Sequence, residues 1–203
     1  MYSHSGFVNE SMKKGRLDVI SGPMFSGKSA ELIRRLTIQD IAQKKIVVFK
    51  HGADDRFGHP EDISSRNGHH LSAIPVKQVS EMYDHLDSAL GGQGFDNLDL
   101  VGIDEIQFFD KDELVELCKK LVDEKGISVI ACGLDSDYLR VPFETTAHLM
   151  ALADSVYKSN AVCMKCRDTD AVYTHRLSGG DDRFEVGSDN YEPRCRKCRV
   201  SGE

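Results

Sequence analysis

A glycine-bounded loop near the amino end has the residue types and spacing of a phosphate-binding site. It runs from Gly22 to Ser29 as Gly-Pro-Met-Phe-Ser-Gly-Lys-Ser and fits Gly-x-x-x-x-Gly-Lys-Ser at all fixed positions. The glycines let backbone N–H groups turn toward phosphate oxygens, and the helix that follows adds the positive end of its dipole. Lys28 would then reach the β- and γ-phosphates, and the Ser29 hydroxyl would be a magnesium ligand. The loop therefore predicts nucleotide binding.

Two acids follow an apolar run further along the chain. The segment 98–105 is expected to be a strand that ends in Asp104 and Glu105. After such a strand in a phosphate-loop protein, the Asp usually holds magnesium, directly or through water, and the Glu can act as general base. Two adjacent carboxylates also favour a metal between them or a raised pKa on one of them.

Two polar loops offer further candidates. Asp54, Asp55 and Arg56 follow a strand end, where ligands meet an open α/β sheet. Either a carboxylate there supports magnesium while Arg56 stabilises the transferring phosphoryl group, or the loop is simply solvated, which the local sequence favours. Tyr138, in the loop after a strand at 127–134, either stacks on a planar base or packs on its own loop.

Two Cys-x-x-Cys pairs lie near the carboxyl end, Cys163 with Cys166 and Cys195 with Cys198. Four thiolates in two such pairs can close a tetrahedral zinc site that leaves no position open for catalysis. Disulfides are the alternative, but the chain carries no secretion signal, which indicates a compartment that keeps thiols reduced. A structural zinc site is therefore the prediction.

The segment between the cysteine pairs is expected to be a hairpin tied at its base by the metal. Its strands are predicted at 171–177 and 183–186, and a short loop follows at 187–191. The hairpin either grips a small ligand through its backbone or only packs on the main sheet. The remaining cysteines, Cys118 and Cys132, suit buried apolar positions.

Strands and helices alternate around these residues, which predicts an α/β fold with a mostly parallel sheet flanked by helices. The expected helices span 30–43, 80–90 and 112–125, and the expected strands include 46–50, 98–105 and 127–134. We divide the chain into a flexible arm (1–14), a phosphate-loop nucleotide-binding domain (15–156) and a small zinc-binding domain (157–203).

Composition narrows the class of protein. The net charge of -7 argues against a nucleic-acid backbone as the main partner, because phosphate neutralisation needs clustered Lys and Arg. The chain shows neither a signal peptide nor an apolar run of roughly 18 residues, so we expect a cytoplasmic protein without a membrane partner. One rival interpretation is a phosphate-loop ATPase whose zinc ribbon binds nucleic acid.

In this order, the motifs resemble those of the type II (cellular and bacterial) thymidine kinases. The shared features are the Gly-Pro-Met-Phe-Ser-Gly-Lys-Ser loop, Asp-Asp-Arg at 54–56, Asp-Glu-Ile-Gln-Phe-Phe at 104–109, Leu-Asp-x-x-Tyr at 134–138, Tyr-Thr-x-Arg-Leu at 173–177 and both cysteine pairs. The match runs from about Gly15 to Cys198 and covers nearly the whole chain.

The resemblance implies a RecA-like phosphate-loop domain, joined to a zinc-binding domain with a lasso-like loop. It implies transfer of the γ-phosphate of ATP to the 5′-hydroxyl of thymidine, which gives thymidine monophosphate and ADP in nucleotide salvage. Deoxyuridine is expected to be a second acceptor. It also implies magnesium bound with ATP, a structural zinc ion, a homotetramer and feedback inhibition by thymidine triphosphate.

The resemblance also assigns roles to residues, with Glu105 as general base and with Ser29 and Asp104 as magnesium ligands. The residues implied to bind ATP are Gly22, Pro23, Met24, Phe25, Ser26, Gly27, Lys28, Ser29, Asp54, Asp55, Arg56, Asp104, Glu105, Ile106 and Gln107. The residues implied to bind thymidine, in the lasso largely through the main chain, are Met24, Leu134, Tyr138, Thr174, Arg183, Phe184, Glu185, Val186, Gly187 and Tyr191.

Two positions depart from the family pattern. Between Gly187 and Tyr191 there are three residues, one fewer than in many members, which affects the lasso contacts expected there. Ile106 stands where many members have Gly or Ala. Its larger side chain either tightens the pocket beside Glu105 or points into the core.

Overall fold

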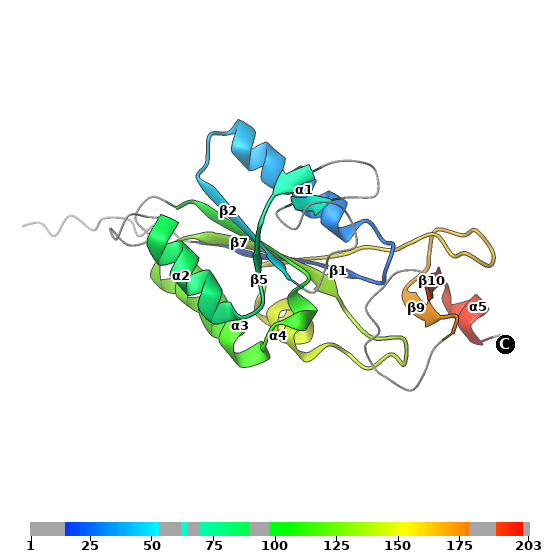
Figure 1. Ribbon diagram of the computed structural model, residues 1–203. Coiled ribbons are helices and arrows are strands. Elements are labelled where there is room, and N and C mark those ends of the chain that lie inside the picture. Colours follow the sequence, from blue (N-terminus) through cyan, green and yellow to red (C-terminus); the bar gives the residue numbers. More distant parts are fainter. Residues whose placement is uncertain (1–14, 53–61, 65–69, 90–97, 179–189, 201–203) are drawn as a thin grey trace, which may run out of the picture.

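The computed structural model describes residues 15–52, 62–64, 70–89, 98–178 and 190–200. Its centre is a six-stranded sheet in the order β5-β2-β6-β7-β1-β8, in which every neighbouring pair is parallel (Figure 1). The strands are β1 (Leu17–Gly22), β2 (Ile46–His51), β5 (Ile74–Val76), β6 (Leu100–Asp104), β7 (Ser128–Leu134) and β8 (Ser155–Lys158). The predicted α/β fold with a mostly parallel sheet is confirmed.

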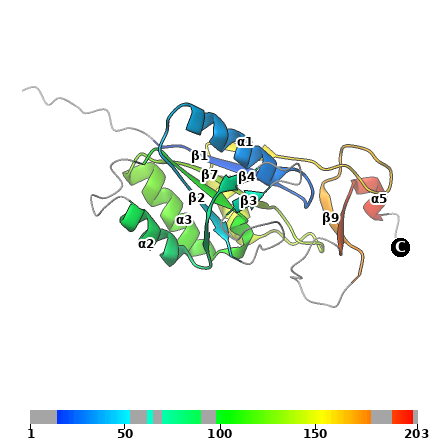
Figure 2. The ribbon, with the colours of Figure 1, turned by 45° about the horizontal axis from the view of Figure 1, so that its top comes forward.

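Helices cover both faces of this sheet (Figures 1 and 2). On one face lies α1 (Lys28–Ile41), whose Leu32, Ile33 and Leu36 pack on the sheet. On the other lie α2 (Val79–Ala89), α3 (Lys111–Lys119), which continues as a π-helical turn η2 (Lys120–Glu124), and α4 (Glu144–Leu152). Burial on both faces explains why β6 reads as an unbroken apolar run before its terminal acid. Among the described helices, none is both long and apolar enough to cross a membrane.

The carboxyl ends of three central strands bring the candidate residues to one edge of the sheet. β1 leads into the phosphate loop, β6 ends in Asp104, and β7 leads into the segment 135–143. β7 lies between β1 and β6 in the sheet. Ligands of open parallel sheets bind at this edge, so the topology places the site there.

The chain after β8 forms a small unit beyond that edge (Figures 1 and 2). We call residues 161–178 and 190–200 the four-cysteine unit; it contains β9 (Tyr173–Arg176), β10 (Tyr191–Arg194) and α5 (Arg196–Val200). β9 pairs antiparallel with β10, whose first residue was expected to end a loop. The strand predicted at 183–186 lies outside the described residues.

Several other elements were not expected from the sequence, among them α4. β8 pairs with β1 as the last strand of the sheet and reaches Lys158, so it spans the proposed domain boundary at 156/157. A second antiparallel pair joins β3 (Asp62–Ser64) to β4 (His70–Ser72). The division into domains stays a prediction.

Candidate active site

The phosphate loop joins β1 to α1 through a tightly bent backbone. Gly27 is the N-cap of α1 and has φ 78°, a left-handed conformation that favours glycine. A Cβ atom at Gly22 would lie 2.4 Å from the carbonyl oxygen of Ser159, so a larger residue does not fit. Lys28 Nζ donates to the Pro23 carbonyl at 2.8 Å, which holds its charge over the loop. Both motif glycines and the lysine therefore have a local geometric reason for their identity.

Ser159, just after β8, supports the phosphate loop from the side. Its backbone N–H donates to the Ser21 carbonyl at 2.8 Å, and its hydroxyl lies 2.9 Å from the Ser26 hydroxyl. Sequence reasoning missed this residue, because a lone serine carries no signal and its partners lie more than 130 positions away.

Asp104 lies at the buried end of β6. Its carboxylate accepts a hydrogen bond from the backbone N–H of Glu105 at 2.9 Å. Burial, and next the neighbouring charge of Glu105, raise the pKa of Asp104 to about 7, although hydrogen bonds from groups that include the Ser29 hydroxyl act the other way. The ionisation of Asp104 is thus suppressed relative to that of an exposed aspartate.

Glu105 has a constrained backbone and a constrained carboxylate. Its φ of 55° and ψ of 43° are left-handed, a conformation that costs a non-glycine residue about 1–3 kcal/mol. The Gln107 amide donates to the Glu105 carboxylate, and its Oε1 accepts from the Leu134 backbone N–H at 3.0 Å. Gln107 therefore ties the acid at the end of β6 to the end of β7.

Gly133 of β7 leaves room for the short 3₁₀ turn η1 (Ile106–Phe108), which contains Gln107. A Cβ atom at Gly133 would lie 2.6 Å from both Gln107 Oε1 and Ile106 Cγ1. The Ile106 side chain is fully buried in the cluster between the sheet and α2, α3 and α4. Of the two orientations expected for Ile106, the structure has the one that points into the core.

The segment 135–143 is folded back on itself by Asp137. The buried Asp137 carboxylate accepts hydrogen bonds from the backbone N–H groups of Leu139 at 2.9 Å and Val141 at 2.8 Å. This turn presents Tyr138 to β9, where the Arg176 guanidinium lies 4.8 Å from the Tyr138 ring centroid. The same guanidinium lies 5.9 Å from the ring of Tyr191. Arg176, which the motif at 173–177 contains but to which we gave no role, therefore links two tyrosines that the resemblance assigns to thymidine.

One hydrogen bond joins the phosphate loop to the four-cysteine unit. The backbone N–H of Met24 donates to Thr174 Oγ1 at 3.0 Å, across 150 positions of sequence, and both residues are buried. β9 thus lies directly against the loop that is expected to hold phosphate.

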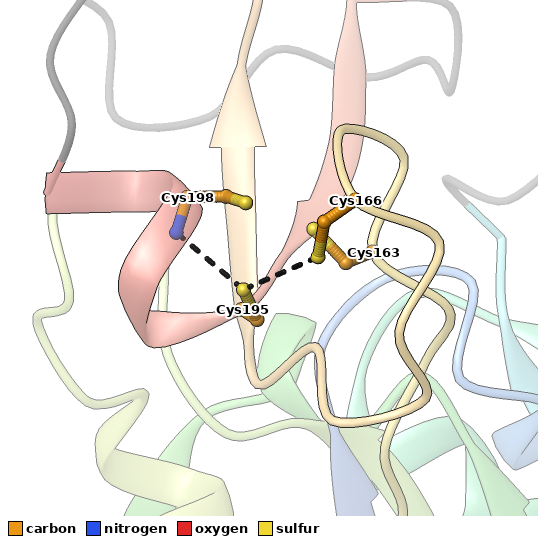
Figure 3. Close-up of side chains that lie close together, drawn as sticks. All are labelled: Cys163, Cys166, Cys195 and Cys198. Atoms are coloured by element: carbon orange, nitrogen blue, oxygen red, sulfur yellow. Dashed lines mark hydrogen bonds between the residues drawn. The ribbon is translucent and has the colours of Figure 1, made fainter.

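The four cysteines converge as predicted (Figure 3). All four sulfur atoms lie within 4.8 Å of one another, and the Cys166 and Cys195 sulfurs are 3.7 Å apart. A tetrahedral site with Zn–S bonds of about 2.3 Å would hold its sulfurs about 3.8 Å apart. The cluster therefore has the donor set and the size that suit a structural zinc ion.

Comparisons with known proteins agree with this geometry. Residues 15–199 match the family model described as thymidine kinase. A thymidine kinase of Bacteroides thetaiotaomicron is 39% identical over 97% of this chain and 94% of that protein. One of Mycoplasma mobile is 40% identical over 93% of this chain and 89% of that protein. This chain belongs to the thymidine kinase family.

A solved structure of a flagellar accessory protein from Methanocaldococcus jannaschii has a looser likeness, with a TM-score of 0.43 and 15% identity over 90% of this chain and 88% of that one.

The fold of this thymidine kinase brings most of the predicted site residues to one edge of the sheet. Those that it brings together are the phosphate loop, Asp104, Glu105, Gln107, Leu134, Tyr138, Thr174 and Tyr191. The candidates outside the described residues are Asp54, Asp55, Arg56, Arg183, Phe184, Glu185, Val186 and Gly187.

Proposed function

We propose that this thymidine kinase holds both substrates in the cleft between the phosphate loop and the four-cysteine unit. The γ-phosphoryl group of ATP would pass there to the 5′-hydroxyl of thymidine, giving thymidine monophosphate and ADP. The observation that carries the proposal is the Met24–Thr174 hydrogen bond, because it joins the loop for the donor phosphates to the strand of the acceptor lasso. An ATPase driven by nucleic acid would not need that junction.

Glu105 is the proposed general base. The thymidine hydroxyl is a weak nucleophile until its proton has an acceptor, and a carboxylate within hydrogen-bond reach supplies one as the bond to phosphorus forms. The left-handed backbone of Glu105 and the amide of Gln107 both restrict where that carboxylate points. Restriction before substrate arrives lowers the entropic cost of reaching the reactive geometry.

The phosphate side of the cleft is assigned to residues 22–29, with their backbone N–H groups and Lys28 around the β- and γ-phosphates. Lys28 would exchange its bond to the Pro23 carbonyl for phosphate oxygens. The residues proposed for magnesium, Ser29 and Asp104, both offer oxygen ligands and interact with each other, so their placement fits a hard cation. Magnesium, when bound, would neutralise charge on the phosphates. Roles for Asp54, Asp55 and Arg56 stay predictions.

The acceptor pocket is assigned to Met24, Leu134, Tyr138, Thr174 and Tyr191. Tyr138 would stack on thymine, with Arg176 leaving the ring face that it now covers. Main-chain contacts from 183–187 are predicted to complete the pocket. Because the loss of one methyl group costs only about 1–3 kcal/mol, we expect deoxyuridine to be accepted too.

Four further assignments rest on the sequence, the family resemblance and the cysteine geometry. We propose that zinc occupies the cluster formed by Cys163, Cys166, Cys195 and Cys198. A homotetramer, feedback inhibition by thymidine triphosphate and a cytoplasmic location stay predictions.

The proposal is tested by measuring ADP release from ATP in three parallel reactions, with thymidine, with single-stranded DNA and with neither. Release that depends on thymidine and yields thymidine monophosphate in a 1:1 ratio with ADP is the expected result. If DNA stimulates ADP release and thymidine does not, the proposal is wrong and the protein acts as the ATPase. A fourth reaction with deoxyuridine reports the selectivity of the acceptor pocket.

A further inference from the structure

A cavity lies beside β9 and is lined by Tyr173 but not by Thr174. Its volume is about 390 Å³, and it opens between the segment 135–143, α4, the end of β8 and the four-cysteine unit. The segment after β7 reaches toward β9 in both ribbon views (Figures 1 and 2), and its Asp135, Ser136, Arg140 and Pro142 line the cavity. Small-molecule sites usually have volumes of about 300–1,000 Å³, so the cavity is large enough for a ligand.

Strand geometry separates this cavity from the proposed active site. Successive side chains of a strand point to opposite faces. Thr174 points to the phosphate loop, where it accepts from Met24, and its neighbour Tyr173 lines the cavity. In the segment 135–143, which is a turn and not a strand, Tyr138 meets Arg176 at the acceptor side while Arg140 lines the cavity. A molecule in the cavity would therefore not overlap with thymidine or ATP.

The cavity wall gathers positive charge around one aromatic ring. The guanidinium carbons of Arg140 and Arg196 lie 5.0 and 5.5 Å from the Tyr173 ring centroid, and that of Arg199 lies 5.1 Å from it. Arg196 also donates to the Tyr173 hydroxyl at 2.6 Å. In the described part of the chain, the ion pairs include none of these three arginines. The three positive charges surround one ring and repel one another, and an anion bound on the cavity side would reduce that cost.

The rest of the lining limits what kind of anion fits. Lys158 adds a fourth cation, but Asp135 neutralises it at 3.0 Å. The uncompensated charge is thus carried by arginines, whose planar forks match the oxygens of a phosphoryl group. Beside them the wall is apolar, with side chains from Ala147 and Met150 of α4.

We propose that this cavity is a binding site for a phosphate monoester, with the phosphoryl group on Arg140 and Arg196 and an apolar body against α4. Two sources share this chemistry, an organic monoester and free inorganic phosphate. The apolar wall favours the monoester, because inorganic phosphate leaves that wall in contact with water. The site is independent of the roles proposed for the cleft.

The test is calorimetric titration of the full chain in which the cleft is filled with thymidine and a non-hydrolysable ATP analogue with magnesium. Phenyl phosphate is the probe, inorganic phosphate tests the free anion, and benzoate tests a carboxylate of similar size. We expect one phenyl phosphate per chain and affinity that falls roughly tenfold or more in Arg140→Gln, since one charge-assisted hydrogen bond contributes about 1.5–3 kcal/mol. Arg34→Gln removes an exposed arginine of α1 and is the matched control.

Each outcome bears on the proposal. Weaker binding of phenyl phosphate to Arg140→Gln and to Arg196→Gln, with thymidine turnover retained in both, supports the site and shows that the variants are folded. Inorganic phosphate that binds as tightly as phenyl phosphate supports the anion site but assigns it to the free ion. No saturable binding to the wild type, equal affinity in all variants, or equal affinity for benzoate would overturn the phosphate monoester site.

Discussion

The parallel sheet and the four-cysteine unit bury their interiors in different ways. Both faces of the sheet are covered by Leu, Ile, Val and Met side chains, among them Leu32 and Leu36 on one face and Leu114 and Leu117 on the other. The buried cluster of the four-cysteine unit contains two alanines and three cysteines, Ala161, Cys163, Ala171, Cys195 and Cys198. So small an apolar cluster stabilises little by removing surface from water.

The two sides of the proposed cleft therefore depend on two different sources of stability. The phosphate loop, Asp104 and Glu105 lie at the ends of strands that a large apolar core fixes. Thr174 and Tyr191 are held by a two-stranded ribbon, whose stability we attribute to the proposed zinc ion. Removal of metal should therefore affect the acceptor half of the site and spare the donor half.

The largest effect is expected from Cys195→Ala. Loss of one ligand should release zinc and unfold the four-cysteine unit, and turnover of thymidine should fall by roughly 1000-fold or more. That factor represents only about 4 kcal/mol, less than the roughly 10–16 kcal/mol that a structural zinc ion can contribute. Binding of an ATP analogue should change little. Metal content, kinase rate and nucleotide affinity together check the prediction.

Cys118→Ala is the matched control for that variant. Cys118 is buried in α3, where burial raises the pKa of its thiol to about 12, and it lies far from the cluster in the fold. We expect zinc content and turnover close to wild type. If Cys195→Ala keeps full turnover without zinc, the comparison between the two regions is wrong.

Glu105→Gln should give the next largest effect, and on the other side of the comparison. The amide has nearly the same shape but accepts no proton, so turnover should fall by roughly 100-fold or more while both substrates still bind. Zinc content should not change. Rapid-quench measurement of the phosphoryl-transfer step checks this, with the exposed Glu116→Gln of α3 as control. Turnover like that of wild type would show that another group takes the proton.

The same contrast explains what could be read from the sequence. The phosphate loop, the acids after β6 and the cysteine pairs were predictable, because each is a local pattern whose chemistry fixes its spacing. The central strands were predictable because a sheet buried on both faces needs continuous apolar runs. Cys118 and Cys132 are buried, as predicted.

Contacts between distant parts of the chain could not be read in this way. Nothing near Thr174 indicates its bond to Met24, and nothing near Arg176 indicates that it lies between the rings of two tyrosines. β10 was missed because Pro193 argues against a strand. In the structure this proline is opposite Thr174 in a two-stranded ribbon, where its missing N–H is tolerated at an edge.

Thr174→Val tests the junction between the two regions. Valine keeps the shape but leaves the buried Met24 N–H without its acceptor, at a cost of about 1–3 kcal/mol. If this cost weakens the binding of thymidine in the proposed cleft, the KM for thymidine should rise roughly tenfold while the KM for ATP changes less. Thr174→Ser keeps the oxygen and should stay near wild type. Equal changes in both variants would mean that the methyl group, and not the hydrogen bond, joins the two regions.

The smallest effect concerns the stability of the sheet region, and Asp104→Asn measures it. Burial and the charge of Glu105 raise the pKa of Asp104 to about 7 from 3.8, so between these values the folded chain binds a proton that the unfolded chain has lost. The contribution of this group to stability therefore falls as pH rises from about 4 to 7 and stays low above that. Asparagine cannot ionise, so without magnesium the variant should exceed the wild type at pH 8 by about 1 kcal/mol or more, an advantage that shrinks toward pH 5. Urea unfolding at both pH values checks this, with the exposed Asp87→Asn of α2 as control. The ionisation of Asp104 makes the difference in the free energy of unfolding between variant and wild type depend on pH. A difference that is equal at both pH values would therefore come from packing and not from ionisation.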